Sequence, residues 1–200
     1  GFDVIALKSA GCSAVELKKL GYDALALKTA GYSLTMLRDA TYGIDSLRHC
    51  GFDVIEFRTA GFIATELKAG GFDIRALKSA GFDSKTLRSI GYSVLEIFHC
   101  GCDAFELKTA GFDATALKSC GFDVMSLKSV GFDAAALKAA GYNLRALHDA
   151  GFTLDKLVAA QFSATELKGL GFDAKALKLA GLSLSALKDA SFAIDDLKSA

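Results

Sequence analysis

The sequence predicts an all-α solenoid, a superhelical array of about twenty short helices with one helix in each ten-residue repeat. Three observations support this. The consensus Gly-Phe-Asp-Ala-x-x-Leu-Lys-x-Ala runs from Gly1 to Ala200 without an insertion or deletion. A helix-capping residue opens most repeats, and a glycine follows most of the apolar runs. Ten residues cannot hold a core of their own, so consecutive repeats must stack on one another.

The start of each helix is predicted by column 3, where the ten positions of the repeat are numbered as columns 1 to 10. Column 3 is Asp, Ser, Thr or Asn in 17 repeats, and such side chains accept from the free amides of a first turn. Columns 4 to 10 then give helices of about seven residues, the last over 194–200. Glutamate three residues after the cap predicts capping boxes at Ser13/Glu16, Asp53/Glu56, Ser93/Glu96, Asp103/Glu106 and Ser163/Glu166.

The end of each helix is predicted by columns 1, 2 and 7. Column 1 is Gly in 17 repeats, which suits the left-handed residue that closes a helix. Column 2 is Phe or Tyr in 17 repeats and column 7 is Leu in 18. In a Schellman cap the column 2 ring packs back on the preceding column 7 Leu, and as a staple it contacts the next one. One ring is therefore expected to join two consecutive helices.

A five-residue β-solenoid is the alternative fold, because Phe and Leu recur five residues apart. That fold needs a small inward residue two positions before each of them. Ala, Leu and Lys favour helix, whereas Asp and Gly are poor strand formers. Column 5 also breaks the β requirement with charged residues, namely Asp45, Arg75, Lys85, Arg145, Asp155 and Lys175.

The unbroken period predicts one continuous array over 1–200 rather than separate globular domains. No terminal repeat has a clearly polar outer face, which suggests a segment of a longer array or a subunit that stacks end to end. The apolar runs are too short for a transmembrane helix, so membrane insertion is not expected. No secretory signal is visible, and five cysteines in unequal columns favour a reducing, intracellular compartment over a disulfide framework.

Column 8 is Lys or Arg in 17 repeats, and this basic row has two interpretations. Cations near helix C-termini complement the helix dipole, and their stems cover apolar surface. Alternatively the row binds a polyanion. The chain has 23 basic and 23 acidic residues, which disfavours nucleic acid as that partner. The candidate contacts are Lys8, Lys18, Lys28, Lys108, Lys118, Lys128 and Lys138.

The largest departure from the consensus lies between Ile97 and Phe105. Phe98 replaces the column 8 cation, Cys102 replaces the column 2 ring, and Phe105 adds a ring in column 5. Phe98 or Phe105 could fill the volume that Cys102 leaves, since cavities are costly. The alternative is that Phe98, His99 and Phe105 form an apolar contact surface for a partner.

Metal and catalytic sites find little support in the sequence. His99, Cys100 and Cys102 are ligand types for zinc, and His49-Cys50 repeats the His-Cys pair. However, column 10 holds small or apolar residues throughout, so its cysteines are expected to pack as small hydrophobes. No metal, cofactor or catalytic residue is predicted, and an enzyme is not expected.

The repeat resembles the tandem Gly-aromatic-x-x-x-x-Leu-Lys-x-Ala units of uncharacterised short-helix repeat proteins from algae, other protists and microbes. The resemblance covers the whole chain and implies an architecture without an activity. The leading hypothesis is a non-enzymatic structural protein, a spacer or filament-forming segment that assembles end to end or laterally. The alternative is a solenoid binding scaffold for a protein or a polyanion, through the Lys/Arg row or the Phe98–Phe105 region.

Overall fold

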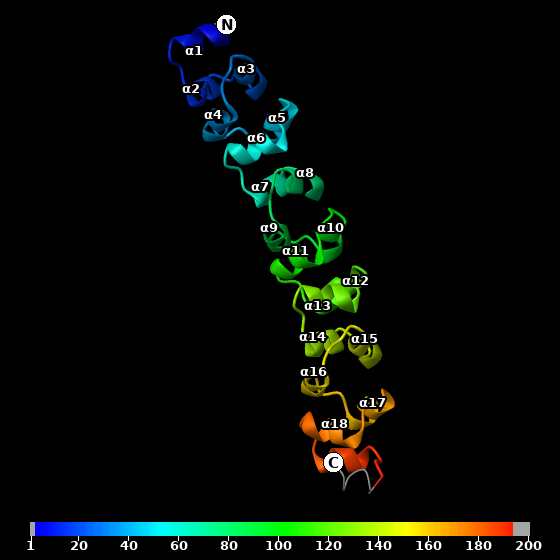
Figure 1. Cartoon of the computed structure of the whole chain (residues 1–200). Helices are drawn as coiled ribbons and strands as arrows, with labels where there is room; N and C mark the ends of the chain where they lie inside the picture. Colours follow the sequence, from blue (N-terminus) through cyan, green and yellow to red (C-terminus); the bar gives the residue numbers. More distant parts are fainter. Residues whose placement is uncertain (1–2, 194–200) are drawn as a thin grey trace. The chain divides into compact units, whose positions relative to one another are not determined.

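The computed structural model describes residues 3–193, in which every regular element is a short α-helix (Figure 1). Two compact halves, Gly1–Cys100 and Gly101–Ala200, are each described by themselves. The first half contains α1 (Val4–Ser9), α2 (Ala14–Lys19), α3 (Ala24–Thr29), α4 (Leu34–Asp39), α5 (Ile44–His49), α6 (Val54–Thr59), α7 (Ala64–Ala69), α8 (Ile74–Ser79), α9 (Ser84–Ser89) and α10 (Val94–Phe98). The second contains α11 (Ala104–Thr109), α12 (Ala114–Ser119), α13 (Val124–Ser129), α14 (Ala134–Ala139), α15 (Leu144–Asp149), α16 (Leu154–Ala159), α17 (Ala164–Gly169), α18 (Ala174–Leu179) and α19 (Leu184–Asp189).

The predicted fold class is confirmed, because these helices recur with the period of the repeat in a solenoid-like array and the described residues hold no strand. The helices start at column 4 as expected but end at column 9, one position earlier than predicted, and the column 10 residue is the C-cap, as at Ala110. The exception is α10, which ends at Phe98 in column 8 with His99 as its C-cap. The helix predicted over 194–200 lies outside the described residues.

The N-caps lie in column 3, as predicted. Asp113 Oδ1, for example, accepts from the Ala116 amide at 2.8 Å. Thr153 is an exception among the predicted capping types, because it precedes α16 without a side-chain bond to the helix. The caps therefore follow the column, and in most repeats the side chain contributes as expected.

Complete capping boxes form at four of the five predicted pairs: Ser13/Glu16, Asp53/Glu56, Ser93/Glu96 and Ser163/Glu166. At the fifth, Asp103 accepts from the Glu106 amide at 2.8 Å. Ile63 cannot cap with its side chain, yet the Glu66 carboxylate accepts from the Ile63 amide at 2.9 Å. Half of a box can thus form even where the column 3 residue is apolar.

Most of the helix C-termini close as Schellman caps. At the end of α11 the Gly111 amide donates to the Lys108 carbonyl at 2.8 Å, and the Phe112 amide donates to the Leu107 carbonyl at 3.1 Å. Gly111 has φ +89°, in the left-handed region where a side chain is strained. Gln161, which replaces the column 1 glycine, is held in the same region at φ +61°.

The core of each half is a row of column 7 side chains, which are fully buried from Leu17 onward in the first half and as far as Leu187 in the second. Phe57 is the one ring in this row and shows what the row contacts. Its centroid lies 6.5 Å from that of Phe52, the staple partner, and 5.1 Å from that of Phe62, the Schellman partner. Both predicted contacts, the staple and the Schellman contact, therefore occur at Phe57, each made by a different ring. That one ring makes both contacts stays a prediction. Phe72 adds a third contact at 5.1 Å, from one repeat further along.

Helices also pack on the next but one, a step that the sequence left open. Such contacts join α2 to α4, α3 to α5 and α6 to α8 in the first half, and α12 to α14, α14 to α16 and α17 to α19 in the second. Tyrosine hydroxyls reinforce the same step between alternate repeats. Tyr32 donates to the Cys12 carbonyl at 2.5 Å, and Tyr142 donates to the carbonyl of Phe122.

Candidate functional site: the cation ladder

Most of the column 8 cations do not project as a free row, because they bind the backbone of another repeat. The Lys118 ammonium, at the end of α12, donates to the Ala140 carbonyl at 3.0 Å and to the Gly141 carbonyl at 2.7 Å. It also lies 4.7 Å from the centroid of the Tyr142 ring. One side chain thus contacts columns 10, 1 and 2 where the chain leaves α14, two helices ahead. We call this arrangement a rung and the series of rungs the cation ladder.

Rungs recur along both halves. Lysine and arginine both form them in the first half, and lysine forms them in the second. Arg48, for example, donates to the Gly70 carbonyl at 2.6 Å and stacks 4.8 Å from the Phe72 centroid. Rungs with both a carbonyl bond and a ring contact start at Lys8, Lys18, Lys28, Arg38, Arg48, Arg58 and Lys68 in the first half. In the second half they start at Lys108, Lys118, Lys128, Lys138 and Lys168.

The chemistry of a rung follows from the unpaired carbonyls at a helix end. The last carbonyls of a helix have no amide partner within it and carry partial negative charge. In helices this short, carbonyls without an amide partner make up much of the backbone. A cation from another helix provides a hydrogen-bond donor for one or two of them. The adjoining ring face adds a cation–π contact. The cations that form rungs thus bind carbonyls at a helix C-terminus, the kind of group that the dipole interpretation names, but at the helix two further on.

Where arginine forms the rung, its guanidinium lies close to the column 1 glycine. A Cβ on Gly61 would lie 2.6 Å from Nη1 of Arg38, and one on Gly81 would overlap Nη1 of Arg58. At Thr41, where the rung comes from Lys18, the hydroxyl accepts from the ammonium at 2.8 Å. The flexible end of an arginine can move aside at small cost, so the left-handed backbone is the main constraint on column 1.

The seven lysines predicted as partner contacts are all half-buried rungs: Lys8, Lys18, Lys28, Lys108, Lys118, Lys128 and Lys138. A polyanion would have to compete with carbonyl oxygens and ring faces for their ammonium groups. The partner role of these lysines stays a prediction. What sequence reasoning missed is which helix each of these lysines binds, because that depends on contacts between repeats that are not consecutive.

The residues around the irregular repeat divide between the halves. Phe98 ends α10, half-buried, with its ring centroid 5.8 Å from that of the exposed His99. In the second half, Phe105 lies on α11 and is 64% exposed, while Cys102 is only 2% exposed. The interpretation that Phe105 fills the volume left by Cys102 is therefore wrong, since an exposed ring fills no core volume. A partner role for Phe98, His99 and Phe105 stays a prediction.

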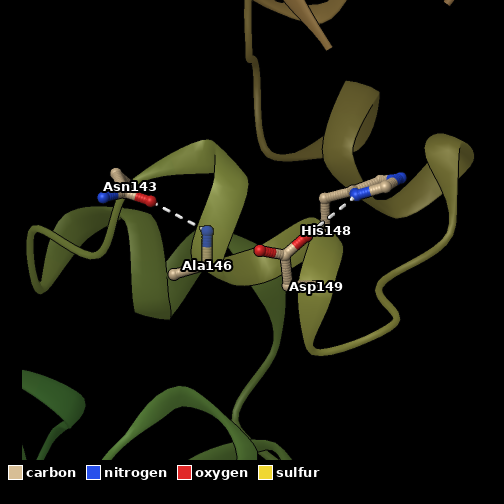
Figure 2. Close-up of polar contacts among 4 residues, drawn as sticks. All are labelled: Asn143, Ala146, His148 and Asp149. Atoms are coloured by element: carbon tan, nitrogen blue, oxygen red, sulfur yellow. Dashed lines mark hydrogen bonds and ion pairs between the residues drawn. The ribbon is translucent and has the colours of Figure 1, made fainter. Parts of the chain in front are cut away.

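His148 and Val158 are variations of the rung. The His148 ring lies edge-on to Phe172, the column 2 ring three repeats further on, with centroids 5.6 Å apart. Figure 2 shows His148 Nδ1 3.4 Å from the carboxylate of Asp149, at the opposite end of α15 from the Asn143 cap. Val158 lacks a charge, and the column 2 residue three repeats after it is Leu182, which lacks a ring. The cation and its ring are thus absent together.

Several titratable groups outside the ladder have pKa values that are shifted by helix-capping bonds or by burial. The Ser163 amide and hydroxyl both donate to Glu166, and these bonds lower the pKa of its carboxyl. Burial raises the pKa of the Tyr142 phenol. Burial likewise raises the pKa of the Cys50 and Cys120 thiols, so they are protonated, poor nucleophiles at neutral pH. All five cysteines are free thiols.

Within residues 3–193, no three side chains of the His, Cys, Asp or Glu type gather as a metal ion would require. No helix in that range is long and apolar enough to cross a membrane. Neither the curated proteins nor the solved structures contain a significant match to the sequence.

A family model described as a decapeptide repeat region matches residues 1–72, 41–113, 91–163 and 131–200, which together cover the whole chain. The chain belongs to this family of decapeptide repeats. The resemblance noted from the consensus is thereby confirmed. In this decapeptide repeat protein the consensus residues are accounted for by caps, core and ladder: columns 1 and 3 cap the helices, columns 2 and 7 pack, and column 8 forms rungs.

Proposed function

We propose that this decapeptide repeat protein is a non-enzymatic structural protein, a spacer or filament-forming segment. The observation that carries the proposal is the cation ladder. The most abundant charged side chains of the repeat bind the backbone two helices ahead, as Lys118 binds Ala140 and Gly141. Residues used in this way stabilise the array and leave few consensus groups for chemistry. Repeat proteins of this kind gain stability from each neighbour contact, so their length can change by whole repeats.

Two measurements test the structural role. If the protein is a spacer, its length should depend on the number of repeats. Removing 41–60 (two repeats) or 41–80 (four repeats) should then shorten the distance between fluorescent labels at positions 5 and 95 in equal steps. Deletions of whole repeats keep every residue in its column, although removal of 41–80 places Arg38 three repeats before Cys102, where column 2 has no ring. A filament-forming segment predicts growth of fibres with concentration under electron microscopy and in sedimentation. A strict monomer at high concentration, together with unchanged distances in the deletion variants, would contradict both forms of the proposal.

A binding scaffold is the second candidate, supported by exposed apolar side chains in column 5. Phe105 is 64% exposed and Met125 is 59% exposed, although both are large enough to be core residues. Phe105→Ser should then weaken capture of a protein partner without altering the helical content. For a polyanion partner, heparin retention should fall when several rung lysines become Gln. Lys85 and Lys175 are exposed column 5 lysines outside the ladder. If heparin retention falls as much when they become Gln, the ladder is not the contact.

A further inference from the structure

A groove beside α14 and α16 differs in charge from a groove that has the same position in the repeat elsewhere in the chain. It encloses about 460 Å³, within the range that holds small molecules. Its apolar walls come from Phe132 and Phe152 and from four alanines, while two lysines and one aspartate supply the charge. The lining alanines are Ala134, Ala135, Ala159 and Ala160.

A second groove, beside α2 and α4, has the same position in the repeat and shows what is particular to the first. It also encloses about 460 Å³, and each column that lines it lines the first groove too. In column 6 it presents Met36 where the first groove presents Lys156, and in column 9 it presents Asp39 where the first presents Ala159. The two grooves therefore have similar volumes but differ in charge, with the added cation of the first at column 6.

Lys156 is the residue that sets the charge of the α14–α16 groove. Column 6 of the repeat is otherwise Ala, Glu, Ser, Thr, Met or Asp, so Lys156 is the one cation in that column. Its ammonium makes no hydrogen bond or ion pair with any described residue. The other lysine of the lining, Lys128, is already bound to the Ala150 and Gly151 carbonyls at 2.7 and 2.8 Å.

The acidic group in the groove is partly compensated. Asp133 is the N-cap of α14, and its Oδ1 accepts from the Ala136 amide at 2.7 Å. The charged lining is thus two ammonium groups against one capped carboxylate. The groove thus combines apolar walls with an ammonium group, that of Lys156, which pairs with no described residue. These features match a molecule with an apolar body and a single negative charge.

We propose that the α14–α16 groove binds a small monocarboxylate with an apolar ring or short chain. The apolar body lies on the alanines and the two phenylalanines, and the carboxylate pairs with the Lys156 ammonium at the rim. The pair is exposed to water, so it selects the charge of the ligand more than it sets the affinity. A ligand of about a dozen heavy atoms is expected to bind with a dissociation constant of about a millimolar.

The test is a nuclear magnetic resonance titration of the full chain with 4-phenylbutyrate, observed at alanine methyl groups. Saturable shifts are expected at Ala134, Ala135 and Ala159. Lys156→Gln should weaken binding about fivefold, the value of one exposed ion pair. Lys175→Gln, at an exposed lysine of the same half, should leave it unchanged. The alcohol 4-phenylbutanol should bind about fivefold more weakly than the acid and should be insensitive to Lys156→Gln.

Gain of binding in the other groove completes the test. Met36→Lys with Asp39→Ala gives the α2–α4 groove the column 6 charge and the column 9 alanine of the first, and should create a second set of saturable shifts at Ala14. Ala159→Leu should remove binding from the first groove by filling it, with circular dichroism as the check that the helices persist. Methyl shifts that never saturate, or an equal affinity for acid and alcohol, would overturn the proposal. Equal weakening by Lys156→Gln and Lys175→Gln would overturn it too.

Discussion

Replacing Lys118 with methionine removes the charge of one rung while an unbranched apolar side chain stays in place. The wild-type ammonium donates to the part-buried Ala140 carbonyl at 3.0 Å and to the exposed Gly141 carbonyl at 2.7 Å. Water can replace the exposed bond, so its loss costs little. The part-buried bond from a charged donor is worth about 1.5 kcal/mol. The contact with the Tyr142 ring, at 4.7 Å, adds about 0.5 kcal/mol. The expected total is about 2 kcal/mol.

The loss should be local to the end of α14, where amide hydrogen exchange can report it. The Gly141 amide donates to the Lys138 carbonyl at 2.8 Å, and the Tyr142 amide donates to the Leu137 carbonyl at 3.0 Å. A loss of about 2 kcal/mol corresponds to exchange that is about 30-fold faster at these two amides. Urea unfolding of the same variant should show a lower midpoint.

Two variants control for the substitution itself. Lys175→Met changes an exposed column 5 lysine of the same half, so its effect should stay within about 0.5 kcal/mol. Lys118→Arg should keep most of the stability, because arginines such as Arg48 form the same rung elsewhere. If Lys118→Met and Lys175→Met cost the same, the ladder contributes nothing to stability and the structural argument for column 8 fails.

Three further predictions concern the exceptions and the caps. Val158→Lys combined with Leu182→Phe should build a rung, and in a double-mutant cycle it should stabilise by about 1 kcal/mol more than the sum of the single changes. Gln161→Gly should raise the free energy of unfolding by about 1 kcal/mol, because glycine adopts φ +61° without strain. Because bonds from Ser163 lower the pKa of Glu166, this box stabilises the fold above the ordinary value of 4.5 and is lost as pH falls through the lowered value; titration of the carboxyl by magnetic resonance should place its midpoint below 4.5.

The predictions for single positions have matched controls. Gln161→Ala keeps a Cβ at the left-handed position and should give little of the gain expected of glycine. Ser163→Ala removes the hydroxyl bond to Glu166, so the carboxyl should titrate closer to its ordinary value. A midpoint for Glu166 that does not move in Ser163→Ala would show that the hydroxyl is not among the causes of the shift.

The helix ends could be predicted from the sequence because their causes are local. Asp113 and Gly111 act within one repeat, through a cap bond at 2.8 Å and a left-handed backbone. The rung from Lys118 to Tyr142 could not be predicted, because which repeats meet depends on how helices stack.

The one trace of the ladder in the sequence is the joint loss of the cation and its ring at Val158 and Leu182, which stand three repeats apart. That signal is weak. Lys78 has the same relation to Cys102 and keeps its charge although column 2 there holds no ring. A single matched pair against such an exception does not identify which repeats are in contact.

The burial of single side chains at the irregular repeat is also hard to predict from the sequence, because it depends on packing between repeats. Phe105 replaces a variable residue in column 5, and column 5 is exposed along the described chain. The ring therefore takes the exposure of its column rather than the burial typical of its residue type. Cys102, in a column that packs, is buried for the same reason even though it is small. Column membership, more than hydrophobicity, decides where a side chain lies.

Because a residue's column decides its burial, residues that depart from their column are the better candidates for a function beyond folding. A property shared by most repeats, such as the rung formed by Lys118, contributes to the stability of every neighbour contact and so supports a structural role. A property confined to one repeat cannot be required by the array, because the other repeats fold without it. Lys156 is such a property: one cation in column 6, paired with no described residue, beside a groove whose equivalent near α2 has methionine instead. Since stacking does not need this charge, the position is free to take part in recognition of a ligand.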